Sequence, residues 1–483
     1  MHGLGRRSGG MTDMRERRLS LDVRMHTALV ICLCFLLSST GWLSWLYHVV
    51  TVATPVPVEF LTMACGYVVQ ALGIGAYILL LRANDESRAR KVVVCSLALG
   101  LLSLVPATTS PSLAVTLATG YAFNLMCGVL QGHYLNLLSS HVDQRWRGTT
   151  FGCAYAASTL ATWLLSLPGG GVLTSGLPSL ACCLVMGVVS FALVIQMPAV
   201  SPQSGTPDAA EVRADTDGHL NDVALVCLSI TLASVVRTAG FSFPADDLSG
   251  GINLELSRLL YGLGLIAAGI VSDRDRRLGF ALCAISLAMP LLMLALSGAG
   301  ASGMPLWTLG YLLTGIYVLF SVLLTTDGAS REARPHLAGV GMMLRHVGDA
   351  IGTSLYLALE ARPIALIVVT TGLLVVTMAL FFMLYQRLFV PAALVQDSGG
   401  ATTPQAEGVP SERAVFDRFA ARHELSLRER DVLRFVLAGK SNAEVAGELH
   451  VSERTVKFHV SNLLKKTGCK TRVQIVDLYA SER

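Results

Sequence analysis

The chain has 483 residues, of which 53% are hydrophobic and 14% are charged, and its mean hydropathy is positive. Because an ordinary soluble domain carries about 25% charged residues, this composition excludes a soluble enzyme and indicates a polytopic membrane protein. The formal net charge of +4 is small, so the placement of the charges is more informative than their sum.

Apolar runs repeat throughout the region before Val390, and each is long enough to cross a bilayer core of about 30 Å. The twelve predicted spans are 26–48, 57–81, 92–108, 112–138, 148–168, 177–197, 222–242, 252–272, 278–298, 303–325, 337–360 and 363–386. A polar segment rich in turn-forming residues divides them into two sets of six. The predicted parts of this region are a basic tail (1–25), a first half (26–197), a linker (198–221) and a second half (222–388).

Basic residues are distributed unevenly between the predicted loops. On one side of the membrane every loop carries arginine or lysine, whereas the loops of the other side contain only Arg362. Loops rich in Lys and Arg stay in the cytoplasm. The sequence therefore predicts a multi-pass protein of the cell membrane with both termini cytoplasmic.

The loop after the eighth predicted span contains a recognisable motif, Gly269-Ile-Val-Ser-Asp273-Arg274-Asp-Arg276-Arg277. Together with the six-plus-six layout, it resembles the G-x-x-x-D-R-x-G-R motif of the major facilitator superfamily. The matching residues are Gly269, Asp273, Arg274 and Arg277. Arg276 stands where the motif has glycine, and the equivalent first-half loop, RANDESRARK, lacks the pattern. The resemblance implies a major-facilitator-like bundle in which the four matching residues form a conformational-switch loop.

Ionisable residues inside membrane spans are costly and by default indicate function. In the eleventh predicted span, Arg345 and Asp349 lie at i and i+4 on one helical face, with His346 beside them. These three residues are the candidate ligand or coupling site, and they imply a small-molecule partner. The alternative is that they hold helices together by hydrogen bonds. Both interpretations also apply to the charged residues near the outer ends of the seventh and eighth spans, Arg237, Glu255 and Arg258.

Eleven cysteines are present, ten of them inside apolar runs, and no CxxC pair occurs. Without ligand spacing, small buried apolar side chains explain these cysteines better than a metal site or a disulfide framework. The sequence also lacks a nucleophile–base–acid set, a phosphate-binding loop and zinc spacing. We therefore expect no metal, no cofactor and no enzymatic activity.

The composition changes after the last predicted span. Residues 389–423 are rich in Gly, Pro and Ala and are predicted to be a flexible linker, and 424–483 form a polar, helix-rich module. Apolar period and helix punctuation divide this module into four short helices. Asn442 and Ser452 are expected to cap the second and third helices.

Four segments of this module, LSLRERDVL, GKSNAEVAGEL, SERTVKFHVSNLLKK and KTR, match in order and spacing the LuxR/GerE-type helix-turn-helix family of bacterial transcription regulators. The resemblance implies a four-helix domain that places its third helix in the major groove of double-stranded DNA. The positions that read base edges fall on Lys457, Phe458 and Ser461. The positions turned toward phosphates fall on Thr455, His459, Lys465 and Lys466. The fourth helix, from Thr471 to Ala480, matches the element through which such domains form dimers.

The two resemblances together imply an all-α protein, in which a twelve-helix membrane bundle precedes a LuxR-type helix-turn-helix domain. The favoured function is a membrane-tethered DNA-binding transcription regulator whose bundle senses a ligand or a membrane signal, with the lipid bilayer and promoter DNA as partners. The alternative is a major-facilitator-type transporter that carries a regulatory DNA-binding tail. The incomplete loop motif favours the regulator. A tail that contacts only other proteins is a weaker third hypothesis.

Overall fold

The computed structural model describes residues 5–52, 54–81, 86–166, 176–195, 216–240, 254–296, 304–332, 334–389, 412–423, 425–449 and 452–481. Every regular element in these ranges is a helix. The chain divides into two compact units, Met1–Phe389 and Val390–Arg483. We call the first unit the bundle and the second unit the head.

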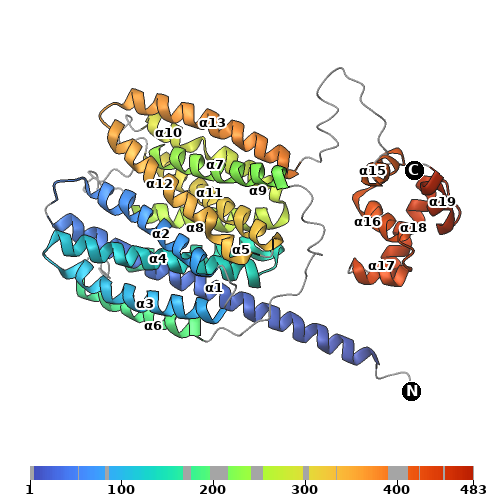
Figure 1. The fold of residues 1–483 in the computed structure, drawn as a ribbon, viewed down its shortest axis with the longest axis horizontal. Coiled ribbons are helices and arrows are strands. Elements are labelled where there is room, and N and C mark those ends of the chain that lie inside the picture. The colour runs from blue at the N-terminus through green and yellow to red at the C-terminus, as the bar shows by residue number, and fades with distance from the viewer. Residues whose placement is uncertain are drawn as a thin grey trace. The chain divides into compact units, whose positions relative to one another are not determined.

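The first half of the bundle consists of long helices that lie side by side (Figure 1). They are α1 (Gly5–Thr51), the π-helical turn η1 (Phe60–Ala64) that continues into α2 (Cys65–Leu80), α3 (Glu86–Thr109), α4 (Leu113–His141), the short turn η2 (Gln144–Trp146), α5 (Arg147–Ser166) and α6 (Gly176–Ile195). Helix α1 begins within the predicted basic tail, and its apolar part starts at Leu21.

The second half repeats this arrangement. Its helices are α7 (Thr216–Gly240), α8 (Leu254–Arg274), α9 (Arg276–Ser286), α10 (Met289–Leu296), α11 (Met304–Arg331), the turn η6 (Pro335–Gly339), α12 (Val340–Leu359) and α13 (Pro363–Phe389). The predicted ninth span is broken between α9 and α10, since Pro290 lacks the N–H that a continuous helix would need. Helix α11 continues past its predicted end at 325, which places Asp327 on a helix.

Every predicted span contains helix in its described residues, so the all-α membrane bundle is confirmed. Within the described residues, six helical segments are long and apolar enough to cross a membrane, and the count of twelve spans remains a prediction. Most of the predicted linker 198–221 lies outside the described residues, and α7 begins at Thr216.

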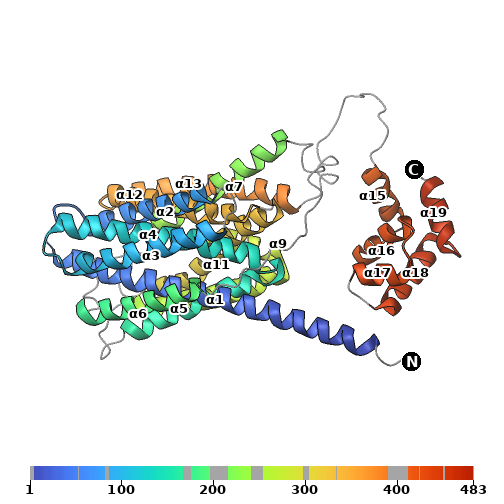
Figure 2. The ribbon, with the colours of Figure 1, turned by 60° about the horizontal axis from the view of Figure 1, so that its bottom comes forward.

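The two halves meet along α5 and α8, and also along α2 and α12. Figures 1 and 2 both show α2 of the first half beside α12 of the second half. The backbones of α5 and α8 touch at two glycines. A Cβ atom on Gly269 would lie 2.5 Å from the carbonyl oxygen of Gly148, so neither position has room for a side chain. Small residues commonly permit such close helix packing in membranes.

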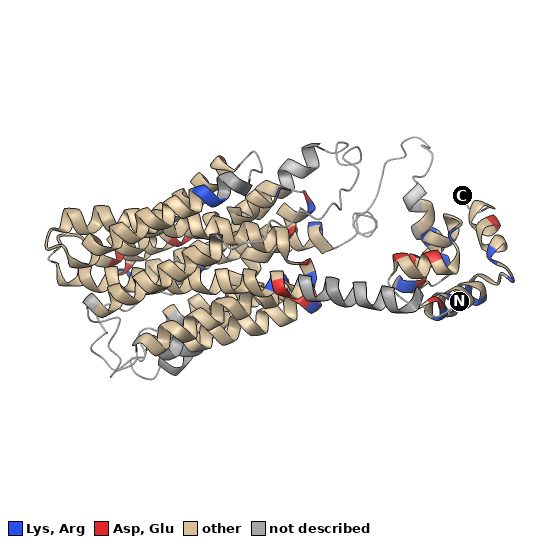
Figure 3. Ribbon diagram, turned by 90° about the horizontal axis from the view of Figure 1, so that it is seen from below, with Lys and Arg blue, Asp and Glu red and all other residues tan. Residues whose placement is uncertain are grey.

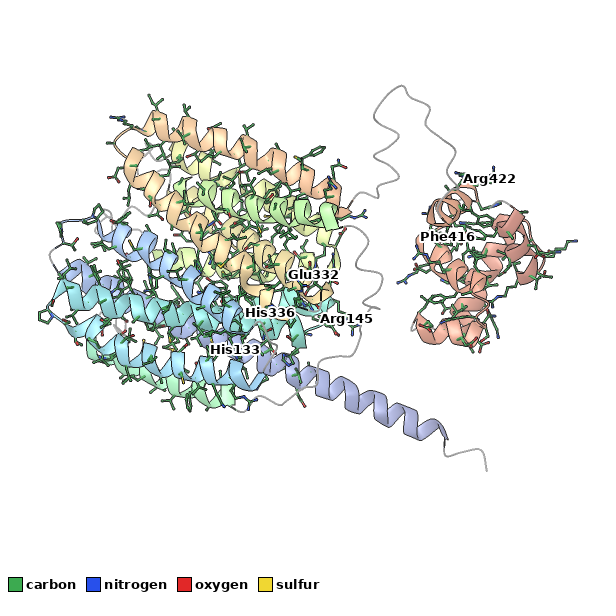
Figure 4. The ribbon with its side chains drawn as sticks, viewed as in Figure 1. His133, Arg145, Glu332, His336, Phe416 and Arg422 are labelled. Atoms are coloured by element: carbon green, nitrogen blue, oxygen red, sulfur yellow. The ribbon has the colours of Figure 1, made fainter. Side chains whose placement is uncertain are left out.

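Charged side chains are rare along the described part of the bundle and gather at one end (Figure 3). We call this the basic end. It contains the connections between α4 and α5, between α8 and α9, and between α11 and η6. Figure 4 labels Arg145, Glu332 and His336 there.

The head has its own hydrophobic core, built by five helices: α15 (Glu412–Arg422), α16 (Leu427–Leu437), α17 (Asn442–Glu448), α18 (Glu453–Thr467) and α19 (Arg472–Ser481). Helix α15 corrects the predicted linker 389–423, because its Phe416 (Figure 4) and Phe419 are buried in that core against Tyr479 of α19. The head therefore begins at Glu412 at the latest. The linker residues 390–411 lie outside the described residues.

Serine side chains cap three helices of the head. Ser452 is the N-cap of α18 and accepts a hydrogen bond from the Thr455 N–H. The predicted cap Asn442 is wrong, since the N-cap of α17 is Ser441, which forms a reciprocal capping box with Glu444. Asn442 is already helical, and its Oδ1 accepts a long 3.4 Å hydrogen bond from Arg472.

This geometry predicts unequal effects of two neighbouring substitutions. Ser441→Ala should lower the free energy of unfolding of residues 412–483 by about 1 kcal/mol, because the N–H of Glu444 loses its acceptor. Asn442→Ala should change it by about 0.5 kcal/mol or less, since it removes only a long surface contact. Urea unfolding followed by circular dichroism measures both, and the reverse order of the two effects would contradict the assigned cap.

Candidate nucleic-acid interface and bundle cavity

Helix α18 presents one polar face to solvent. Val456 and Leu463 are fully buried in the core of the head, which turns the opposite side of the helix outward. That side carries Arg454, Lys457, Phe458, Ser461 and Lys465, all exposed. The three residues predicted to read bases therefore lie together on one accessible face.

Phe458 is unusual on this face. It is 62% exposed, and it is one of two large hydrophobic side chains that the described part of the head exposes; the other is Val473 of α19, at 67%. Lys457 beside it forms an ion pair with Glu453 at 2.9 Å, but both side chains are largely exposed. Such surface pairs are weak, so Lys457 is available to an external acceptor.

The residues predicted to contact phosphates differ in their surroundings. Thr455 and His459 are half-buried at the edge of the exposed face, and Lys465 is exposed. Lys466 instead donates a 2.8 Å hydrogen bond to Glu429 of α16, which is buried. Lys466 thus already has a structural partner within the head.

Glu429 connects α18 to the start of α16. Its Oε2 accepts hydrogen bonds from Lys466 and from the N–H of Ser426, both at 2.8 Å. Burial raises the pKa of the Glu429 carboxyl, but the hydrogen bonds from Lys466 and Ser426 outweigh it and leave the pKa below its usual range. The carboxylate form is therefore the one that stabilises the head.

A cavity of about 290 Å³ lies between the two halves of the bundle. The first half contributes Tyr67 and Tyr155 to its wall, and the second contributes Tyr261, Arg237 and Arg345. The wall residues of α5, α11 and α12 lie in the parts of those helices distant from the basic end, so the cavity belongs to the opposite part of the bundle.

The predicted ligand or coupling site lies beside this cavity. Asp349 is completely buried and pairs with Arg345 at 2.9 Å. A second arginine, Arg237 of α7, pairs with the same carboxylate at 2.5 Å, and Thr238 donates to it at 2.8 Å. The sequence placed Arg237 near the mouth of a ligand site, and the structure brings it into the same cluster.

His346, the third predicted residue, points into a chain of buried amides. Its Nε2 lies 2.6 Å from Oε1 of Gln131 on α4. Gln131 donates to Gln70 at 2.9 Å, and Gln70 donates to Asn124 at 2.7 Å. The ring of Tyr67 stacks on His346. Because α4 and α12 belong to different halves, the His346–Gln131 contact bridges them.

A second ionic cluster closes the basic end of the bundle. Arg147 of α5 pairs with Asp327 of α11 at 2.9 Å, and their side chains are only 5% and 8% exposed. Arg276 pairs with the other oxygen of Asp327 at 3.0 Å. We call Arg147, Arg276 and Asp327 the latch, since the cluster joins α5 of the first half to α9 and α11 of the second.

The predicted switch loop lies next to the latch. Asp273 accepts hydrogen bonds from the N–H groups of Gly148 and Thr149, at 2.8 and 2.7 Å, at the start of α5. Gly269 also touches the first half, so two of the four predicted residues contact that half. Arg274 and Arg277 are exposed, and their side chains form no hydrogen bond with described residues.

Arg276, the residue that departs from the motif, makes three side-chain hydrogen bonds. It donates to Asp327, to Asp273 at 3.0 Å and to the carbonyl oxygen of Gln144 at 2.6 Å. The sequence predicted loss of the motif at this position, but the arginine adds contacts between the halves. No sequence signal indicated Arg147 or Asp327 as a pair, because they are far apart in the chain.

The head matches a known family. Residues 423–479 match the bacterial regulatory proteins of the luxR family. The chain is 41% identical over 58 residues to the spore germination protein GerE of Bacillus subtilis (strain 168), which covers 12% of this chain and 78% of GerE. It is 52% identical over 52 residues to the transcriptional regulatory protein YhcZ of the same organism, covering 11% of this chain and 24% of YhcZ. The chain thus spans only about a quarter of YhcZ.

The bundle matches solved transporter structures. The human organic anion transporter MFSD10 (TETRAN) superimposes with a TM-score of 0.52 at 18% identity, covering 76% of this chain and 99% of that one. The fucose:proton symporter FucP of E. coli gives a TM-score of 0.50 at 13% identity, covering 75% and 98%. At such identities the likeness shows the fold alone. The luxR-family resemblance of the head is confirmed, and for the bundle the comparisons confirm the transporter-like fold.

The lowered pKa of Glu429 predicts a pH-dependent stability of the head. The carboxylate contributes fully above the unfolded pKa of about 4.3 and loses its contribution as the pH falls through the lower folded pKa. Glu429→Gln should therefore lower the free energy of unfolding of residues 412–483 by on the order of 1.5 kcal/mol at neutral pH. The difference between the two proteins should shrink with acidification, as measured by urea unfolding between neutral and acidic pH. A difference independent of pH would contradict this role.

The latch predicts a large effect of one buried aspartate. Asp327→Asn leaves Arg147 without a carboxylate in a buried site, which should cost about 3–5 kcal/mol and clearly lower the thermal unfolding midpoint of the full-length protein in lipid nanodiscs. Asp143→Asn is the matched control, because Asp143 pairs with Arg145 at 3.6 Å on the surface, where their side chains are 48% and 75% exposed. Equal shifts for the two variants would show that the latch pair does not stabilise the bundle.

Proposed function

Because this chain belongs, through its head, to the luxR family of bacterial regulatory proteins, we propose that it is a membrane-anchored transcription regulator whose bundle senses a ligand. The observation that carries the proposal is the exposed basic face of α18 in a head that shares one chain with a transporter-fold bundle. The proposal assigns the chain no catalytic activity. Promoter DNA is the output partner, and a small molecule in the bundle is the input.

On DNA, the exposed face of α18 would enter the major groove. Lys457 can donate a hydrogen bond to guanine, and Phe458 can cover a thymine methyl group. Ser461 can donate or accept a hydrogen bond at a base edge. Lys465, Thr455 and His459 would contact phosphates and fix the register. Lys466 matches another phosphate-facing position, and its bond to Glu429 also supports the head itself.

The head is proposed to dimerise through α19. Ile475 of this helix is buried in the core, whereas Val473, Asp477 and Ala480 are exposed at i, i+4 and i+7 on a common face. Because this valine is apolar and exposed, burying its side chain against a second copy would be favourable. A pair of heads related by two-fold symmetry would bind two half-sites about one DNA turn apart.

The membrane orientation follows from the charge distribution. Charges of the described bundle gather at the basic end (Figure 3), and loops rich in arginine face the cytoplasm. We propose that the protein lies in the cell membrane with both termini cytoplasmic. The head then shares a compartment with DNA, and the cavity lies toward the external side.

DNA binding is tested with residues 412–483 on sites selected from a random pool and on the promoter of its own gene. Lys457→Ala should weaken binding by about 1–3 kcal/mol and relax the base preference, because it removes a base contact. Lys465→Ala should weaken binding to all sequences alike and reduce the salt slope by about one. Footprints should cover two half-sites.

Arg418→Ala is the control for charge, since Arg418 is exposed on α15, away from α18. If Arg418→Ala weakens binding as much as Lys457→Ala, the effect is one of net charge and α18 is not the reading helix. A footprint over a single half-site would contradict dimerisation through α19 without affecting the assignment of α18.

A further inference from the structure

The two ionic clusters of the bundle differ in their charge balance. In and beside the latch, two arginines (Arg147 and Arg276) face two aspartates (Asp327 and Asp273). Beside the cavity, Arg237 and Arg345 share Asp349 alone. These four charges balance one another, whereas the three charges beside the cavity leave one positive charge unmatched.

The unmatched charge faces the cavity. Arg237 and Arg345 both line its wall, whereas Asp349 is completely buried behind them and is not part of the wall. Glu59 is the carboxylate on the wall, and no ion pair joins it to either arginine in this described region. A molecule in the cavity thus meets two guanidinium groups and not their counter-ion.

Both guanidinium groups have donors without a strong acceptor. The Nε of Arg237 is buried and has no hydrogen-bond partner. The Nε and Nη2 of Arg345 donate only to the thioether sulfur of Met342, at 3.1 and 3.0 Å, and thioether sulfur is a weak acceptor. Buried donors of this kind gain most from a charged oxygen acceptor, and a carboxylate accepts from guanidinium in a bidentate manner.

The rest of the wall suits an aromatic or apolar body. Tyr67, Tyr155, Tyr261, Tyr311 and Tyr356 line the cavity. Tyr155 and Tyr261 meet edge to face at 5.4 Å, an arrangement that leaves ring surface for a planar guest. A cavity of about 290 Å³ has room for a single-ring or double-ring compound.

We propose that the bundle cavity binds an organic monoanion, a carboxylate on an aromatic or apolar body, with Arg237 and Arg345 as its anion-binding residues. The inference deepens the proposed sensing function and rests on it for its biological role. A bound carboxylate competes with Asp349 for the guanidinium of Arg345. That competition acts on α12, which also carries the His346–Gln131 bridge between the halves.

The test uses the full-length protein in lipid nanodiscs and two sets of probes that differ mainly in charge. The sets are benzoate, benzamide and benzylamine, and phenylacetate, phenylacetamide and phenethylamine. Isothermal titration calorimetry should show saturable binding of at least one carboxylate, with its amide and amine weaker by roughly tenfold or more. An amide that binds as tightly as its carboxylate, a preferred amine, or no binding by either carboxylate would overturn the proposal.

Arg237→Gln is the decisive variant. Asp349 keeps Arg345 as its partner, so the cluster becomes neutral without leaving a buried charge unpaired. Carboxylate affinity should fall roughly tenfold or more, and the thermal midpoint of the unliganded protein should change little. If this variant fails to fold, Arg237→Lys keeps the charge but loses the planar fork, and its affinity should fall by a smaller factor. Unchanged affinity in the folded variant would refute the role of Arg237.

Arg362→Gln controls for a general loss of positive charge, since Arg362 is exposed in the connection between α12 and α13, and it should bind as the wild type does. The DNA readout separates this inference from the proposed function. Carboxylate binding that leaves the operator occupancy of the full-length protein unchanged would support the cavity chemistry and reject sensing. Operator occupancy that responds to a different class of compound, without carboxylate binding, would support sensing and reject the proposed cavity chemistry.

Discussion

A charge buried in a membrane bundle needs an opposite charge nearby, because an unpaired carboxylate or guanidinium in a low-dielectric interior costs several kcal/mol. Two aspartates meet this need here, Asp327 at the basic end and Asp349 beside the cavity, and each contacts two arginines. The two aspartates lie in different parts of the bundle and connect different helices. The first cluster joins the two halves, so separating the halves at that end would break a buried ion pair. The second lies within the second half, beside the bridge from His346 to the first half, where its arginines line the cavity.

Different interactions stabilise the inside of the bundle and the inside of the head. Between membrane helices, apolar side chains gain little from leaving lipid, so close packing at residues such as Gly148 and Gly269 and buried polar contacts contribute most of the specificity. The head has a conventional hydrophobic core, and serine caps and the Glu429–Lys466 contact fix its helices. This division suits a regulator. In the proposed regulator, the input would act through polar contacts of the bundle, and the head would keep the shape that its own core fixes.

Local features of the structure were predictable from the sequence, and long-range contacts were not. The apolar period and the composition of the sequence predicted where the helices lie and which face of α18 is exposed. Both features depend on residues that are close together in the chain. The cap of α17 was misassigned although the pattern Ser441-x-x-Glu444 was available in the sequence. The pair of Arg147 and Asp327 spans 180 positions, and no periodicity connects such residues. Arg276 was interpreted as decay of a motif, but only the fold shows which carboxylates surround it. The burial of α15 was also hidden, since Phe416 and Phe419 pack against Tyr479, which is distant in the chain.

Helix α15 has a consequence for how a signal can act. It is the first described element of the head after the bundle, and its rings pack on α19, the proposed dimer helix, whereas α18 packs mainly against α16 and α17. Helix α15 therefore contacts α19 and α16, through Tyr479 and Arg434. In the proposed dimer, a shift of α15 would change the angle and separation of the two heads and leave the proposed base-reading side chains in place. The regulated quantity would then be the spacing of half-sites that the protein accepts, with its base preference held constant.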